Sequence, residues 1–252
     1  MSDVSPAIPT SSGFQSPPGY FPHITVSFAL SGNQLPADHG YLLYSAVSRA
    51  TQHGSSPTVR EGVGTEPGAV AIGSSRALHN TDWLGIELIS GFPSAPGLIT
   101  LPERGATLRL RIPADHYRDV LQLAGKRLDV GGHQIRLGLP VARPLEPAPS
   151  LYARVVTIKK FTEPESFLEA VNRQLDLLGV KGTAELPRDE QGRYRRRIVT
   201  IHGKSVVGFS VAVDDFNDDD SIKLQSFGVG GRRAMGCGIF NPIAANQAEQ
   251  ER

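Results

Sequence analysis

Cysteine is almost absent from this sequence, and so are several features that would assign it to a particular class. Cys237 is the only cysteine among 252 residues, which excludes an intramolecular disulfide and a cysteine-rich metal site and suits a reducing compartment. No run of about 18 apolar residues occurs, so a membrane span is not expected. The N-terminus does not show a basic segment followed by an apolar one, the pattern of a secretory signal. We therefore expect a cytoplasmic protein with no membrane partner.

A strong excess of positive charge is also missing. The formal net charge is +1, whereas nucleic-acid-binding proteins often carry many more basic than acidic residues. Basic residues are nevertheless concentrated in one segment, which contains Arg188, Arg193, Arg195, Arg196 and Arg197. Any binding of nucleic acid must therefore use a local patch.

Strand and helix patterns occur twice in the same order. The first half predicts strand 24–30, helix 35–51, strands 83–90 and 106–112, helix 113–124 and a strand pair over 126–139. The second half predicts strand 151–160, helix 164–178, strands 195–201 and 206–213, helix 218–227 and strand 239–243. Each half is thus typical of the split βαβ, or ferredoxin-like, unit.

We therefore predict an α+β protein of two tandem ferredoxin-like (RRM-like) domains with antiparallel sheets. The predicted boundaries are a flexible tail at 1–20, an N-terminal domain at 21–143, a linker at 144–150 and a C-terminal domain at 151–252. The glycine-rich loop belongs to the second domain.

This loop, GVGGRRAMGCG at 228–238, matches none of the common ligand-binding motifs. Arg233 stands where a dinucleotide-binding loop needs its third glycine, and Ile198 stands where a P-loop ending at Ser205 needs its first. Neither a calcium loop nor a zinc-ligand spacing is present. Two interpretations remain: bare N–H groups and arginines that approach phosphate, or a turn packed against the other half of the chain.

Several segments together resemble a known family. They are LPADHGYLLYSAVSR (35–49), WLGIELISG (83–91), LRLRIP (108–113), LAGKRLDVGGHQIRLGLP (123–140), LYARVVTIK (151–159) and LQSFGVGGRRAMGCGIFNP (224–242). With the glycine loop before the last strand, they resemble the repeat-associated mysterious protein (RAMP) superfamily of CRISPR systems. The resemblance is to its repeat-processing endoribonuclease, in the variant of the Myxococcus-type subtype.

The resemblance implies an endoribonuclease that cuts CRISPR precursor RNA within its repeats without a metal or other cofactor. In such enzymes the ribose 2′-OH attacks the phosphorus and the 5′-oxygen leaves, which gives 2′,3′-cyclic phosphate and 5′-OH ends. The expected partners are the precursor RNA, as a repeat hairpin whose cut product is retained, and other subunits of an interference complex.

Catalysis of this kind needs a proton acceptor, and histidine is suited to that role near neutral pH. In the family, the catalytic histidine lies on the first helix or in the loop after it, which implies His39, His79 or, as a weaker candidate, His53. His39 also falls on the apolar stripe of the predicted helix, so a core position is the alternative. Tyr44 is a candidate to orient the 2′-OH, whereas Tyr41 is expected to pack.

The predicted RNA-binding residues are those of the arginine cluster, the hairpin turn and the glycine loop. They are Arg193, Arg195, Arg196, Arg197, Lys204, Gly228, Gly230, Gly231, Arg232 and Arg233. Two other functions stay open at this point. One is a non-catalytic RNA-binding subunit of a CRISPR complex, and the other is an unrelated ferredoxin-like enzyme that binds a small phosphorylated molecule.

Overall fold

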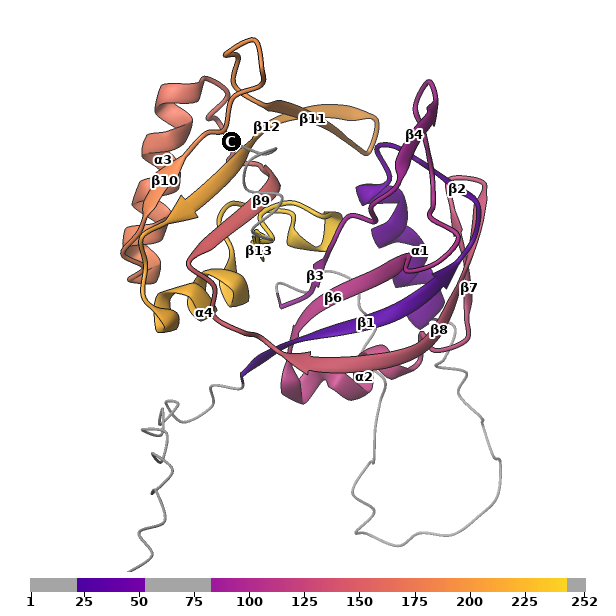
Figure 1. The fold of residues 1–252 in the computed structure, drawn as a ribbon. Coiled ribbons are helices and arrows are strands. Elements are labelled where there is room, and N and C mark those ends of the chain that lie inside the picture. The colour runs from indigo at the N-terminus through magenta and orange to yellow at the C-terminus, as the bar shows by residue number, and fades with distance from the viewer. Residues whose placement is uncertain (1–21, 53–82, 244–252) are drawn as a thin grey trace, which may run out of the picture.

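The structure, a computed structural model, describes residues 22–52 and 83–243 and contains two large antiparallel sheets (Figure 1). The face of each sheet that the helices do not cover is turned toward the other domain, and residues of both domains line the space between them. Of the helices in the described residues, none combines the length and apolar character that a membrane crossing needs.

The N-terminal sheet has the strand order β3-β6-β1-β8-β7. Its elements are β1 (His23–Ser31), α1 (Gly40–Gln52), β3 (Gly85–Ile86), β6 (Thr107–Pro113), η1 (Ala114–His116), α2 (Tyr117–Leu121), β7 (Arg127–Val130) and β8 (His133–Pro144). β1 pairs with β6 on one side and β8 on the other, as the first strand of a ferredoxin-like unit does.

The C-terminal sheet repeats this arrangement in the order β10-β12-β9-β13, and β11 also pairs with β12. Its elements are β9 (Ser150–Val156), α3 (Pro164–Leu178), β10 (Thr183–Glu185), β11 (Arg196–Ile201), β12 (Lys204–Asp214), α4 (Asp218–Phe227), η2 (Arg233–Met235) and β13 (Asn241–Pro242). The prediction of two tandem ferredoxin-like domains with antiparallel sheets is thus confirmed.

A third, small sheet was not predicted. It pairs β2 (Gln34–Pro36), β5 (Leu98–Thr100) and β4 (Phe92–Ala95), in the order β2-β5-β4. Leu35 pairs with Ile99 and is fully buried, so residues predicted as the first turn of the helix are extended instead. The helix begins at Gly40, and this displacement places His39 immediately before it.

Each sheet has its own hydrophobic core on the helix side. In β1, Val26 and Phe28 are fully buried, while Thr25 and Ser27 point to the opposite face and line the space between the domains. The C-terminal core is built around Phe167 of α3 and Phe209 of β12, whose ring centroids are 4.9 Å apart. The alternation leaves the open sheet faces free for polar residues.

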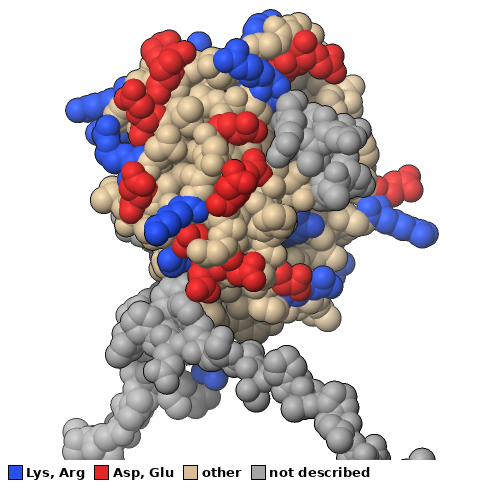
Figure 2. Space-filling view, turned by 60° about the vertical axis from the view of Figure 1, so that its left-hand side comes forward, with Lys and Arg blue, Asp and Glu red and all other residues tan. Residues whose placement is uncertain are grey.

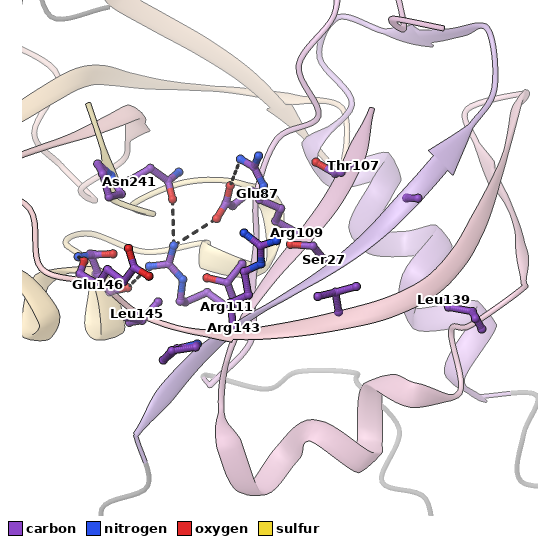
Figure 3. Close-up of a pocket in the computed structure, with 16 residues that line it drawn as sticks. Ser27, Glu87, Thr107, Arg109, Arg111, Leu139, Arg143, Leu145, Glu146 and Asn241 are labelled. Carbon is purple, nitrogen blue, oxygen red and sulfur yellow. Dashed lines mark hydrogen bonds and ion pairs between the residues drawn. The ribbon is translucent and has the colours of Figure 1, made fainter. Parts of the chain in front are cut away.

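Arg111 of β6 joins the two domains through a buried polar network (Figure 3). Its Nη1 donates to the carbonyl of Gln225 at 2.7 Å, and its Nη2 donates to Asn241 Oδ1 at 2.9 Å. The same Nη2 lies 3.2 Å from Glu87 Oε1. Arg111 is only 2% exposed, and burial lowers the pKa of its guanidinium while Glu87 opposes that shift.

We expect Arg111→Met to destabilise the protein strongly, because it leaves the nearly buried Glu87 carboxylate without its main partner. Breaking a buried ion pair from one side typically costs about 3–5 kcal/mol. Arg109→Met is the matched control, since Arg109 also lies near Glu87, at 3.6 Å, but is 54% exposed and should cost about 0–1 kcal/mol. Denaturant unfolding of both variants measures the difference, and equal losses would contradict a special role for Arg111.

Candidate functional site

A basic cleft lies between the two sheets. Arg109 of β6, Arg154 of β9, and Arg195 and Arg197 at the start of β11 line a cavity of about 630 Å³. Glu87 is the one acidic residue in this lining. Its carboxylate pairs with Arg111 and also with Arg109, so it compensates part of the positive charge, and the lining still holds four arginines and one carboxylate. Several guanidinium groups that line one cleft can each bind a phosphate group, so the cleft suits a polyanion that passes between the domains.

The open face of the N-terminal sheet extends this cleft (Figure 3). Ser27, Thr107, Arg143 and Leu139 line it together with Arg109 and Arg111. Leu139 is 79% exposed, which is unusual for an aliphatic side chain on a sheet. This face therefore combines hydroxyl groups, cations and an exposed apolar side chain in one shallow surface.

A different face of the molecule is acidic. Figure 2 shows Asp and Glu side chains across the middle of the side that carries α3 and α4, with Lys and Arg mainly toward the margins. The first turn of α4 contains two exposed carboxylates, Asp218 and Asp219, while Asp220 is buried. A polyanion is repelled by such a surface and is therefore expected to use the cleft side.

The arginine cluster is divided by the alternation of β11. Arg195 and Arg197 line the cleft, whereas Arg196 between them is exposed and lies outside that lining. Arg193 is held in its own loop by Asp189, with Nε 3.0 Å from Oδ2. The structure thus places two of the four predicted arginines, Arg195 and Arg197, in the cleft lining. Arg193 and Arg196 lie outside this lining.

The glycines of the loop are required by packing inside the protein. A Cβ on Gly228 would lie 1.9 Å from the carbonyl oxygen of Gly238, and one on Gly238 would lie 2.1 Å from that of Val229. A Cβ on Gly230 would lie 2.6 Å from the Thr157 oxygen, and one on Gly236 would meet Leu88 at 2.4 Å. Only Gly231, among the glycines of this loop, has no atom within 4 Å of its Cβ position. Close packing inside the protein therefore accounts for four of the five glycines, and of these Gly236 packs against the other half of the chain, at Leu88.

The two arginines of the loop, which are predicted RNA-binding residues, form hydrogen bonds within the protein. Arg233 donates from Nη2 to the carbonyl of Ser226 at 2.6 Å, and its burial, with a smaller effect of Arg111, lowers its pKa to about 10. Arg232 is half-buried and donates to Thr157 Oγ1 at 3.2 Å. Cys237 is fully buried in the same loop, and this burial raises the pKa of its thiol to about 11.

His39 is a buried structural residue, contrary to the expectation that its imidazole faces the substrate. Its Nδ1 lies 2.8 Å from the carbonyl of Pro36, and its Nε2 accepts from the backbone N–H of Ile89 at 2.9 Å. The ring is 0% exposed, and burial is the main cause of a lowered pKa. Since Nε2 accepts and Nδ1 donates, the neutral tautomer ties β2 to the segment after β3.

The hairpin of β11 and β12 reaches across to the start of α1. Tyr41 Oη lies 3.0 Å from His202 Nδ1, and their ring centroids are 4.5 Å apart. The backbone N–H of Thr200 donates to Asp38 Oδ2 at 2.6 Å. Lys204 follows His202 and Gly203 at the same turn and is exposed.

Comparison with known proteins decides the family. A model of the Cas6 family, described as Cas6 Crispr, matches residues 24–245. The chain is 35% identical over 219 residues to the CRISPR-associated endonuclease Cas6 of Myxococcus xanthus (strain DK1622), which is 87% of this chain and 81% of that protein. The chain belongs to the Cas6 family.

Solved structures agree with the Cas6 assignment at the level of the fold. A CRISPR associated protein Cas6 superposes with a TM-score of 0.57 at 12% identity and covers 88% of this chain and 100% of that chain. A Cas6-related protein from Pyrococcus furiosus gives 0.56 at 12% identity, over 89% and 99%. A RAMP protein described as binding different RNA substrates gives 0.54 at 13% identity, over 88% and 100%.

Of the other predicted catalytic residues of this Cas6 chain, the structure describes only Tyr44. Tyr44 is half-buried and packs against the N-terminal core. His79 and His53 lie outside the described residues. In residues 22–52 and 83–243, no group of three or more His, Cys, Asp or Glu side chains is placed to hold a metal ion.

Two features of the site were missed in the sequence. Arg154 is the only arginine of β9 and Arg109 shares β6 only with Arg111, so no dense cluster marked them, although their alternation with apolar neighbours placed them on open faces. His202 and Tyr41 are 161 residues apart, and no local pattern connects them.

We expect Gly238→Ala to lower thermal stability and Gly231→Ala to leave it unchanged. The first variant would place a Cβ against the Val229 carbonyl at a residue with φ 67°, where a left-handed backbone alone costs an alanine about 1–2 kcal/mol. The second has open space, so its effect should stay within about 0.5 kcal/mol. Thermal unfolding measures both, and a similar loss in Gly231→Ala would show that the loop is packed differently.

Proposed function

We propose that this protein is a metal-independent endoribonuclease that processes CRISPR precursor RNA by cutting within its repeats. The observation that carries the proposal is 35% identity, over 87% of the chain, to a protein named as a CRISPR-associated endonuclease of the Cas6 family. The basic cleft between the sheets supports an RNA substrate, because its arginines can contact a phosphate backbone.

In the proposed reaction, the 2′-hydroxyl at the cut site loses its proton and attacks the adjacent phosphorus. The bond from phosphorus to the 5′-oxygen breaks, and that oxygen gains a proton. The products are a 2′,3′-cyclic phosphate and a 5′-hydroxyl, and the proposed step incorporates no water oxygen and uses no metal ion. The protein must supply proton transfer, alignment and positive charge near the phosphorane.

We assign residues to these tasks from the sequence prediction and from the lining of the cleft. His79 and Tyr44 stay predicted catalytic residues, and the alignment of the 2′-OH is assigned to the tyrosine. Lys204 is an exposed cation at the hairpin turn and can neutralise charge on a phosphate. Arg195 and Arg197, with Arg109 and Arg154, hold the backbone on one side of the cut. We also propose that the cut repeat hairpin stays bound and that the protein joins an interference complex.

A non-catalytic RNA-binding subunit is the second candidate. It is favoured by the burial of His39, which removes one predicted catalytic group from the surface. The two candidates share the cleft and differ only in whether bound RNA is cut.

Repeat RNA should be cut in the presence of EDTA, and one 2′-deoxy substitution at the nucleotide 5′ of the cut should stop cleavage. The deoxy RNA should bind with nearly unchanged affinity, because a single hydroxyl is removed while the phosphates remain. Denaturing gel electrophoresis measures cleavage and filter binding measures affinity. Normal cutting of the deoxy RNA would exclude attack by the 2′-OH, and tight binding with no cutting of either RNA would favour the second candidate.

Arg195→Gln with Arg197→Gln should weaken RNA binding and reduce its dependence on salt. Each lost phosphate contact on single-stranded RNA lowers the slope of log K against log salt by about 0.7, so the double variant should lose about 1.4. Arg196→Gln is the matched control, because it removes the same charge from the same strand outside the cleft lining. If the single Arg196→Gln variant lowers the slope by half as much as the double variant does, each arginine contributes only its charge. Such a result would contradict a specific role of the cleft arginines.

A further inference from the structure

His202 occupies an unusual backbone position at the tip of the β11–β12 hairpin. Ile201 pairs with Lys204, so His202 and Gly203 form a two-residue turn, with φ of 50° and 73°. This turn type requires left-handed backbone at both residues, which is why asparagine or glycine usually occupies the first one. A histidine there is uncommon, and a strained residue at an interface is a reason to ask what its side chain does.

The side chain of His202 lies at the junction of the two domains. Its Nδ1 is 3.0 Å from Tyr41 Oη on α1, and the tip is fixed a second time by the Thr200 N–H on Asp38 Oδ2 at 2.6 Å. The charged or titratable groups near the tip of the hairpin are thus Tyr41 of α1, Asp38 just before that helix, and Lys204 of the hairpin itself.

Among the histidines that the structure describes, the others are engaged elsewhere. His23 and His39 are buried, and burial is the first cause of the lowered pKa of each, which for His23 falls to about 4. His116 pairs with Asp119 at 2.8 Å and stacks on Trp83. His133 starts β8 at the β7–β8 turn, beside the edge of the N-terminal sheet. His202 is the exposed imidazole of this described set that bridges the domains.

The geometry points to His202 as a general base of RNA cleavage, with Tyr41 as the residue that positions it; this rests on the proposed function. When Nδ1–H donates to Tyr41 Oη, the neutral ring carries its lone pair on Nε2. Nε2 takes the proton of the 2′-hydroxyl as the 2′-oxygen bonds to phosphorus. The 5′-oxygen leaves and takes a proton from water, and the imidazolium returns its proton to solvent. Lys204 supplies positive charge beside the same turn.

His202→Asn tests this assignment with little disturbance of the fold. Asparagine is favoured in the left-handed turn, and its amide can still hydrogen-bond to Tyr41, but it cannot accept a proton. Single-turnover cleavage at saturating repeat RNA should fall by about 10²–10⁴-fold, while the Kd for the uncleavable deoxy RNA and the melting temperature stay unchanged.

Asp38→Ala tests whether docking of the hairpin, rather than proton transfer by His202, limits cleavage. It removes the hydrogen bond from the Thr200 N–H to Asp38 and keeps His202. It should cut repeat RNA at nearly the normal rate. His202→Asn that cuts normally, or Asp38→Ala that loses as much cleavage as His202→Asn, would overturn the assignment. If the unmodified protein binds repeat RNA and never cuts it, the proposed function itself fails instead.

Discussion

One buried cation holds the two halves of this molecule in register. Arg111 cannot be solvated where it lies, so its charge must be compensated by Glu87, by the carbonyl groups of Gln225 and Phe240, and by Asn241. These partners belong to the segment after β3, to the end of α4 and to the region around β13. The separation of the sheets, and with it the width of the basic cleft, therefore depends in part on these polar contacts.

The glycine loop is the second element that sets this geometry. A Cβ on Gly40 at the start of α1 would lie 2.3 Å from the carbonyl of Met235, and Gly236 lies against Leu88, so the loop is wedged between the domains. At four of its five glycines protein atoms lie too close for a Cβ: backbone oxygens at Gly228, Gly230 and Gly238, and the Leu88 side chain at Gly236. Only Gly231 leaves backbone open to a ligand. The loop thus acts first as part of the frame that places α1 against the C-terminal domain.

The sequence predicted the fold well because periodicity and turn residues report local structure directly. The predicted bounds of α3 and α4 agree with the structure, since Pro164, Gly179 and Gly228 mark helix ends clearly. The start of α1 was misplaced because Leu35 pairs with Ile99, a contact 64 residues away. The helical stripe correctly indicated an inward His39, but the donor that occupies its Nε2 comes from Ile89 and has no local signal. The Tyr41–His202 contact also joins residues far apart in the sequence and has no local signal. By contrast, strand alternation alone predicts that Arg195 and Arg197 lie on one face of the sheet and Arg196 on the other.

The burial of Cys237 has a consequence for chemical labelling of this protein. The thiolate is the reactive form of cysteine, and a pKa of about 11 leaves only about one thiol in 10⁴ ionised at pH 7. Since this is the only cysteine of the chain and its side chain is 0% exposed, we expect the native protein to react slowly with maleimides and iodoacetamides. One cysteine introduced on each lip of the cleft should therefore give a labelled pair, whose fluorophores or spin labels report the distance between the domains without prior removal of the native thiol.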